Sequence, residues 1–189
     1  MNKFINKLSS INLLIVLLVL FIISFYIIMG DYIGSAKLME ITGGVGVIDL
    51  EFAYTQEFVY STLEAQGELG RAFYKDLLIH LDFIFPLVYS LLFTSTILFV
   101  YNKLTDNKTL LTKLMVFPLS IIIFEYIENI CEIIMITNYP NQLATIVIIG
   151  RIATICKIIM ITLTSIIIIV GIILIIINKL KTNKIGEIK

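Results

Sequence analysis

Residues 11–29 read INLLIVLLVLFIISFYIIM and contain no charged side chain. A helix that crosses the hydrocarbon core of a bilayer needs about 20 consecutive, mostly apolar residues. This segment therefore predicts a transmembrane helix. Residues 83–101 and 158–177 are likewise apolar and uncharged, and residues 114–136 form a further apolar segment that three glutamates interrupt. The apolar pattern of the last segment begins earlier, near Leu143, so we expect that helix to project beyond the bilayer.

The composition of the 189-residue chain supports the same fold class. Hydrophobic residues make up 59% of the sequence and charged residues 15%, whereas soluble proteins average about 45–50% apolar and about 25% charged. A soluble domain of this length would leave much of its apolar surface in water. We therefore predict an all-α integral membrane protein, with residues 1–189 forming one membrane domain that is a bundle of four transmembrane helices.

The charges outside the four spans indicate an orientation. Basic residues are in excess in the N-terminal tail, in the loop between spans two and three, and in the C-terminal tail: Lys3, Lys7, Lys103, Lys108, Lys113, Lys179, Lys181, Lys184 and Lys189. The loop over residues 30–79 is acidic instead, with eight acidic and three basic residues. Because basic loops remain in the cytoplasm, both termini are predicted to be cytoplasmic and residues 30–79 extracytoplasmic, in a bacterial plasma membrane.

The N-terminus has a second interpretation. Two lysines, the apolar run and then Gly34-Ser35-Ala36 resemble a signal peptide with a small-residue cleavage site. The apolar run is longer than the hydrophobic region of a signal peptide, which has about 7–15 residues. This difference favours an uncleaved first helix, and cleavage would leave three spans in the same orientation.

The acidic loop is predicted to form a helical cap. Thr55 is a plausible N-cap for a short amphipathic helix over residues 55–65, with Glu57 in its first turn. Gly67 and Gly70 interrupt the pattern, and from Arg71 the chain is expected to run helically into span two. The cap either lies on the membrane surface or covers a site between the helices.

Span three carries polar side chains inside a predicted membrane helix. At about 100° per residue, Glu125, Glu128, Asn129 and Glu132 fall within one arc of roughly 100°. A charged residue near the bilayer centre costs at least about 2.5–3.5 kcal/mol. We therefore expect this stripe to face the bundle interior.

Polar side chains in the neighbouring helices are candidate partners of this stripe. Asp82 and Tyr89 are two turns apart on one face of span two, and a continuous helix would add Arg71 to that face. Pro86 is expected to kink the helix there. The fourth helix supplies the cations Arg151 and Lys157, which are predicted to pair with the carboxylates. Their directions differ by about 120°, so a single compact site need not use both.

The predicted intramembrane charges do not balance. Asp82, Glu125, Glu128 and Glu132 carry four negative charges, while Arg151 and Lys157 carry two positive charges. Close carboxylates in a low-dielectric site cannot all remain ionised, so either some are protonated or a cation is bound. Three interpretations stay open for these residues: structural polar packing, a ligand, proton or ion site, and a catalytic site.

Several functional classes receive no support from the residues. A single His with no HExxH spacing is a poor zinc ligand set, so no metal site is predicted. No serine lies in a GxSxG elbow, and zero net charge gives no support for a nucleic-acid partner. Cys131 and Cys156 lie in apolar segments and are expected to be free thiols. The sequence predicts no particular cofactor.

Three segments resemble those of a group of small bacterial four-span membrane proteins. They are GRAFY at residues 70–74, LDFIFPLVY at residues 81–89 and EYIEN at residues 125–129, followed by Lys157. The group shows similar GR..Y, LD..FP..Y and (D/E)..EN patterns. The resemblance covers roughly residues 49–157 and implies no activity. It implies that the positions of interest are Arg71, Tyr74, Asp82, Pro86, Tyr89, Glu125, Glu128, Asn129 and Lys157.

Together these features predict a membrane protein that binds a small molecule, a lipid or a cation in an outward-facing polar pocket. The candidate binding residues are Asp82, Tyr89, Glu125, Glu128, Asn129, Glu132, Arg151, Lys157 and Arg71. One alternative is an intramembrane enzyme that acts on lipid, with a Glu as general acid or base. Another is a helper subunit that packs against a larger membrane complex, and a homo-oligomer is also possible.

Overall fold

The computed structural model describes residues 2–186 of the chain, and every regular element among them is a helix. Seven helices follow in order along the chain: α1 (Asn2–Leu8), α2 (Ile11–Met29), α3 (Ser35–Thr42), α4 (Gln56–His80), α5 (Phe85–Tyr101), α6 (Lys108–Asn138) and α7 (Ala144–Gly186). Four helical segments are long and apolar enough to cross a membrane: Ile11–Met29, Gln56–Tyr101, Lys108–Asn138 and Ala144–Lys181. The predicted all-helical class with four such segments is confirmed.

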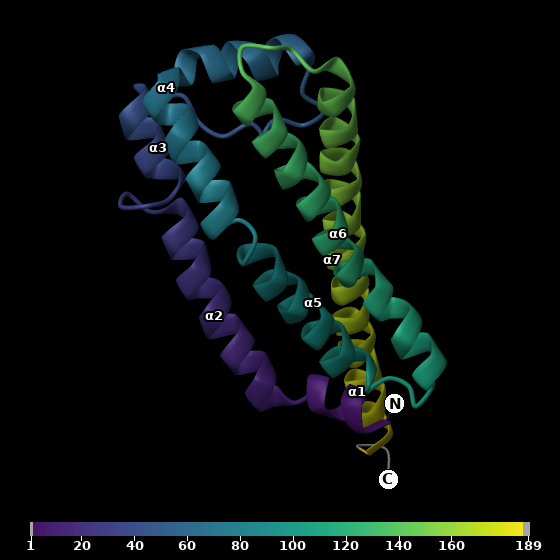
Figure 1. Ribbon diagram of the computed structural model, residues 1–189. Coiled ribbons are helices and arrows are strands. Elements are labelled where there is room, and N and C mark those ends of the chain that lie inside the picture. The colour runs from purple at the N-terminus through teal and green to yellow at the C-terminus, as the bar shows by residue number, and fades with distance from the viewer. Residues whose placement is uncertain (1, 187–189) are drawn as a thin grey trace.

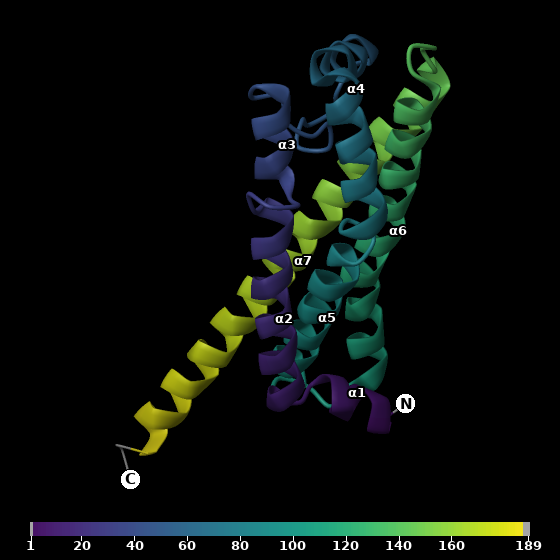
Figure 2. The same cartoon turned by 60° about the vertical axis from the view of Figure 1, so that its left-hand side comes forward.

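The long helices run alongside one another in an elongated bundle (Figure 1). α6 and α7 form the most extensive helix pair, and α5 packs between α2 and α6. α1 and both chain ends lie at one end of the bundle, which we call the α1 end. α3, the first half of α4 and the α6–α7 loop lie at the other end, which we call the α4 end. Toward its C-terminus α7 diverges from the other helices (Figure 2).

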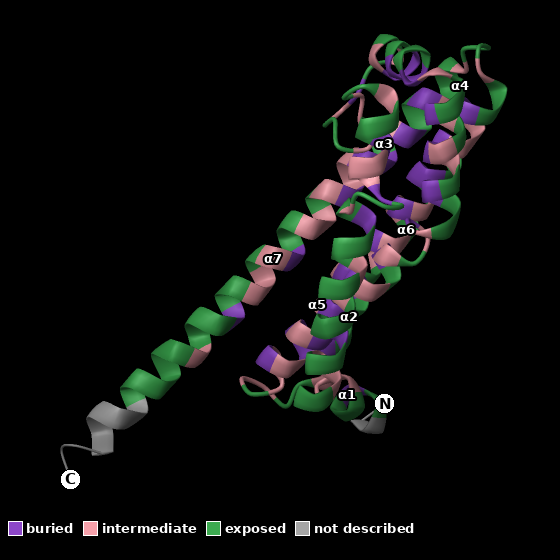
Figure 3. Ribbon diagram, turned by 90° about the vertical axis from the view of Figure 1, so that its left-hand side faces the viewer, coloured by how far each residue is buried: buried purple, intermediate pink, exposed green. Residues whose placement is uncertain are grey.

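The larger of two buried apolar clusters in residues 2–186 lies at the α4 end (Figure 3). The largest apolar cluster joins α3, the loop after it, α4, α6 and the start of α7, and it contains Leu38, Ile48, Tyr54, Val59, Leu63, Tyr74, Leu78 and Met135. In α2 and α7, only 11% of the most apolar stretch is buried within the chain. Both helices therefore present long apolar faces to their surroundings.

Local chemistry explains where α4 begins and bends. The Thr55 side chain accepts a hydrogen bond from the Phe58 amide at 3.1 Å, so Thr55 is the N-cap that the sequence predicted. At Gly67 the backbone takes φ 65° and ψ −177°, a conformation that is essentially restricted to glycine. The first half of α4 consequently lies across the end of the bundle, and the second half runs down into it (Figure 1).

The expected continuous helix from Arg71 through span two is wrong. α4 ends at His80, residues 81–84 form turns, and α5 begins at Phe85. Pro86 stands in the first turn of α5 and does not kink a helix interior. Proline is well tolerated there because its missing N–H would have no helical partner at that position. The break removes the helical face that Arg71 was predicted to share with Asp82.

Candidate functional site

The polar stripe of α6 lies inside the bundle. Glu128, Asn129 and Glu132 are fully buried, and Glu125 is nearly so. The prediction that this stripe faces the interior is confirmed. α6 therefore presents three carboxyl groups to its neighbours α4, α5 and α7.

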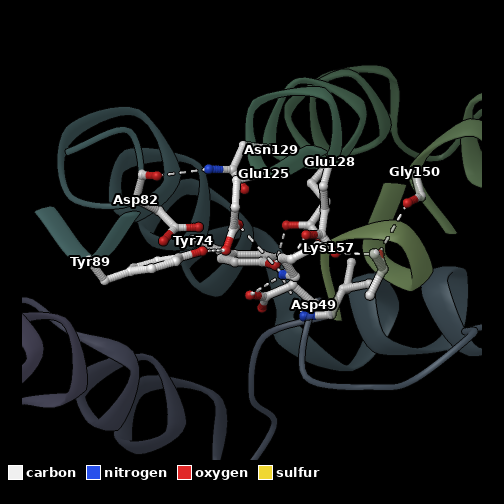
Figure 4. A network of polar contacts seen from close by, with 12 residues as sticks. Asp49, Tyr74, Asp82, Tyr89, Glu125, Glu128, Asn129, Gly150 and Lys157 are labelled. Carbon is white, nitrogen blue, oxygen red and sulfur yellow. Dashed lines mark hydrogen bonds and ion pairs between the residues drawn. The ribbon is translucent and has the colours of Figure 1, made fainter. Parts of the chain in front are cut away.

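Lys157 of α7 is the central cation of the site (Figure 4). Its Nζ lies 2.5 Å from Glu128 Oε2 and 3.5 Å from Glu125 Oε2. A third carboxylate, Asp49 Oδ2, lies 3.8 Å away. Three carboxylates from two parts of the chain therefore lie within 4 Å of one ammonium group.

Hydroxyl groups hold the other oxygens of the α6 carboxylates. Tyr89 donates to Glu125 Oε1, and Thr154 contacts Glu128 Oε1. Tyr74 donates to Glu132 Oε2 at 2.6 Å. Each Glu of the stripe is thus fixed by a hydroxyl from a different helix, which ties α4, α5 and α7 to α6.

Asp82 stands in the turn between α4 and α5. Its backbone oxygen accepts a hydrogen bond from Asn129 Nδ2 at 2.9 Å, and the next carbonyl, of Phe83, accepts one from Tyr126 at 2.8 Å. The Phe83 and Tyr126 rings also stack, with centroids 4.9 Å apart. These contacts hold the turn, and with it the Asp82 side chain, against α6.

Asp49 reaches the site from the loop between α3 and α4, which sequence reasoning did not include. The Ile48 amide donates to the Tyr74 hydroxyl at 3.0 Å, and Gln66 Nε2 donates to the Gly46 carbonyl at 2.9 Å. Both bonds draw this loop down onto the bundle. Asp49 has no periodic pattern around it, so no local signal distinguishes it from the other acids of the loop.

The same loop places Tyr54 beside the α6–α7 contact. A Cβ at Gly150 would meet the Tyr54 hydroxyl and would lie 3.1 Å from Cβ of Cys131. The absence of a side chain at Gly150 therefore allows α6, α7 and the loop to meet. Burial, followed by the negative charge of Glu132, raises the pKa of the Tyr54 hydroxyl, so this group remains neutral beside the carboxylates.

A cavity of about 300 Å³ opens beside these charges. Its polar lining includes Asp49, Asp82, Glu125 and Lys157, together with the Tyr74 and Tyr89 rings. The remaining lining is almost entirely apolar and comes from α2, the loop after α3, α4, α5 and α7: Ile28, Met29, Val47, Leu50, Leu77, Leu78, Phe85, Ile158 and Ile161. The cavity thus has one charged wall and several apolar walls.

The charge excess is larger than the sequence indicated. Five carboxyl groups, those of Asp49, Asp82, Glu125, Glu128 and Glu132, belong to this site, and three of them lie within 4 Å of the ammonium group of Lys157. Full ionisation would leave four uncompensated negative charges, which a low-dielectric site does not sustain. Within residues 2–186, no group of three or more His, Cys, Asp or Glu side chains has the geometry to hold a metal ion.

Two predicted site residues lie elsewhere. Arg151 forms no ion pair with any residue in the described part of the chain, so its predicted pairing with the carboxylates is wrong. Arg71 donates to the Leu63 carbonyl at 2.7 Å and lies over the Tyr139 ring, 4.1 Å from its centroid. Arg71 therefore fastens the bend of α4 to the α6–α7 loop.

Comparison with protein-family models, with curated proteins and with solved structures finds no match for this chain.

Proposed function

We propose that this chain is an integral membrane protein whose four long helical segments span a bacterial plasma membrane. The apolar faces of α2 and α7 support this proposal, because burial within the chain does not account for them. Lys7, Lys103, Lys113 and Lys179 belong to the α1 end, which we assign to the cytoplasm because basic loops remain there. The α4 end, with α3 and the first half of α4 as a helical cap, then faces outward.

We further propose that the protein binds a small molecule, a lipid or a cation in the cavity beside Lys157. The observation that carries this proposal is the composition of the cavity wall, in which a few charged groups stand among apolar side chains. Ligand pockets commonly combine about 300–1,000 Å³ of space, apolar walls and a small number of placed polar groups. With a volume of about 300 Å³, the cavity suits a small ligand or one end of a longer one.

Mass spectrometry of the protein purified in a mild detergent tests this function. The unmodified chain should carry a bound molecule, and both Asp82→Asn and Glu125→Gln should lose it while helical content is retained. Asp76→Asn is the matched control, because it removes an exposed carboxylate from the same half of α4 that leads to Asp82. Equal bound species in all four proteins would overturn the proposal.

A second candidate function is an intramembrane enzyme that acts on lipid. The observation in its favour is the Asp82 carboxylate, which lines the cavity and accepts no hydrogen bond from a described residue. A carboxylate in that position can serve as a general base toward a bound substrate. Incubation of the reconstituted protein with a bacterial lipid extract should then change the mass of one lipid class, and Asp82→Asn should abolish that change.

A further inference from the structure

The Asp82 side chain has an unusual environment for a buried carboxylate. The residue is 7% exposed, yet no described residue forms a hydrogen bond or an ion pair with its carboxylate oxygens. Its backbone is held by Asn129 (Figure 4), and its side chain lines the cavity. A buried charge without a partner is costly, so the geometry leaves room for a partner that comes from outside the chain.

The ammonium group of Lys157, unlike the Asp82 carboxylate, already has oppositely charged neighbours and is not available to bind an anionic ligand. Its Nζ lies 2.5, 3.5 and 3.8 Å from carboxylate oxygens of Glu128, Glu125 and Asp49. A phosphate or carboxylate ligand would have to displace these carboxylates and would then lie among them. The cavity wall therefore selects against anionic ligands and favours cationic ones.

The remaining walls distinguish an organic cation from a metal ion. Within residues 2–186 the acidic side chains do not converge in a metal-binding geometry. Most of the cavity lining consists of apolar side chains such as Ile28, Phe85, Ile158 and Ile161, which offer no oxygen ligands. Apolar groups are good partners for the hydrocarbon part of an amphiphile.

We propose that the cavity binds the protonated amine of an amphiphile, with the Asp82 carboxylate as its counter-ion and the apolar walls around its hydrocarbon part. This inference rests on the proposed ligand-binding function and specifies the class of ligand. The ammonium group brings a positive charge to a site with an excess of carboxylates, and its N–H groups donate to Asp82. The same chemistry occurs in a free alkylamine and in the head group of an aminophospholipid.

A head-group series in dodecyl maltoside micelles tests the inference. Decylamine, decanol and decanoate each have ten carbon atoms and carry a cationic, a neutral and an anionic head group. Each is titrated against the protein while the thermal unfolding midpoint of the protein is followed. A ligand that binds only the folded state raises this midpoint as its concentration increases. We expect decylamine to raise it and the other two probes to have little effect.

Single-residue variants test whether the amine of decylamine contacts Asp82. Asp82→Asn should weaken decylamine binding by at least about tenfold, as expected for losing a charge-assisted hydrogen bond. Asp76→Asn, at an exposed position of α4, should bind decylamine like the unmodified chain. If Asp82→Asn fails to fold, the head-group series on the unmodified chain still decides the question.

The outcomes separate the inference from the function on which it rests. Equal effects of decanol or decanoate would overturn the cationic ligand while leaving a binding pocket. Stabilisation by Mg²⁺ or Ca²⁺ that Asp82→Asn abolishes, without an effect of decylamine, would also overturn it. If no probe binds and no molecule co-purifies, the binding function itself fails. Retention of phosphatidylethanolamine over phosphatidylglycerol supports a lipid source, and decylamine binding without that retention supports a free amine.

Discussion

Lys157 determines the electrostatics of the site at the scale of single residues. One ammonium group compensates carboxylates from α6 and from the loop after α3, and it lies within 4 Å of three of them. Removing one partner of a buried ion pair is far more harmful than never having had the pair, because the remaining charge stays buried. Lys157 is therefore the residue whose loss the fold should tolerate least.

We predict that Lys157→Met lowers the free energy of unfolding by about 3 kcal/mol in detergent. This is the lower end of the range of about 3–5 kcal/mol for breaking a buried pair, because the orphaned carboxyl groups can take up protons. Arg151→Met, on the same helix but outside the ion-pair network, should change stability by less than about 0.5 kcal/mol. Chemical denaturation of both variants provides the measurement.

The double variant Lys157→Met with Glu128→Gln, compared with the two single variants, measures the contribution of the Lys157–Glu128 ion pair to stability. If the ion pair at 2.5 Å dominates, removing the Glu128 charge should recover part of the stability lost in Lys157→Met, because contacting residues are not additive. Strictly additive losses would show that Lys157 acts through its packing and not through its charge.

At the residue level, helical spacing made the buried polar stripe of α6 predictable from the sequence. Glu125, Glu128, Asn129 and Glu132 could be assigned to one buried face because 3.6 residues make a turn. Asp49 could not be assigned to the site in this way, because a loop has no helical periodicity. Its position depends on contacts between residues far apart in the sequence, such as that between Ile48 and Tyr74.

At the scale of elements, the bend of α4 depends on one backbone conformation. Gly67 has φ 65° and ψ −177°, and no atom stands within 4 Å of the position that a Cβ would occupy. A substitution there meets backbone strain and no steric clash. Gly67→Ala should therefore cost about 1–3 kcal/mol of unfolding free energy.

Gly46→Ala is the matched control for this prediction, since Gly46 also has open space around it but no positive φ. We expect its unfolding midpoint to remain close to that of the unmodified chain. Equal stability of Gly67→Ala and Gly46→Ala would contradict the assignment of the bend to Gly67.

The α6–α7 contact gives a second prediction at this scale. Gly→Ala inside a helix ordinarily stabilises by roughly 0.5–1 kcal/mol, but a Cβ at Gly150 would meet the Tyr54 hydroxyl. We expect Gly150→Ala to lower the thermal midpoint. Adding Tyr54→Phe removes the obstructing oxygen and should restore part of the loss, whereas a Gly150→Ala variant that is more stable than the original chain would show that the helices are not in close contact.

The break between α4 and α5 could not be predicted from the sequence. Residues 81–84 contain neither glycine nor proline, and the nearest helix-breaking residue is Pro86, so the local sequence favours an uninterrupted helix. The turn is stabilised instead by the Asn129 and Tyr126 hydrogen bonds from α6. Tertiary contacts of this kind leave no local signature.

At the scale of the whole molecule, the proposed orientation places the α4 end outside the cell. Cysteines at the exposed positions Glu64→Cys and Asn141→Cys should react with a membrane-impermeant maleimide in intact cells. Asp106→Cys, at the α1 end, should react only after the membrane is permeabilised. The unmodified chain, with its native Cys131 and Cys156, supplies the background. Labelling of Asp106→Cys in intact cells would reverse the assignment.

A structure determined from crystals grown in a lipidic mesophase tests the proposed binding function most directly. We predict continuous density for a small or elongated molecule in the cavity bounded by Phe85 and Ile158. Its polar end should lie within about 3.2 Å of the Asp82 carboxylate, the upper limit of an N–H···O hydrogen bond. A cavity closed by side chains, or one that holds only hydrocarbon with no polar atom near Asp82, would contradict the proposal.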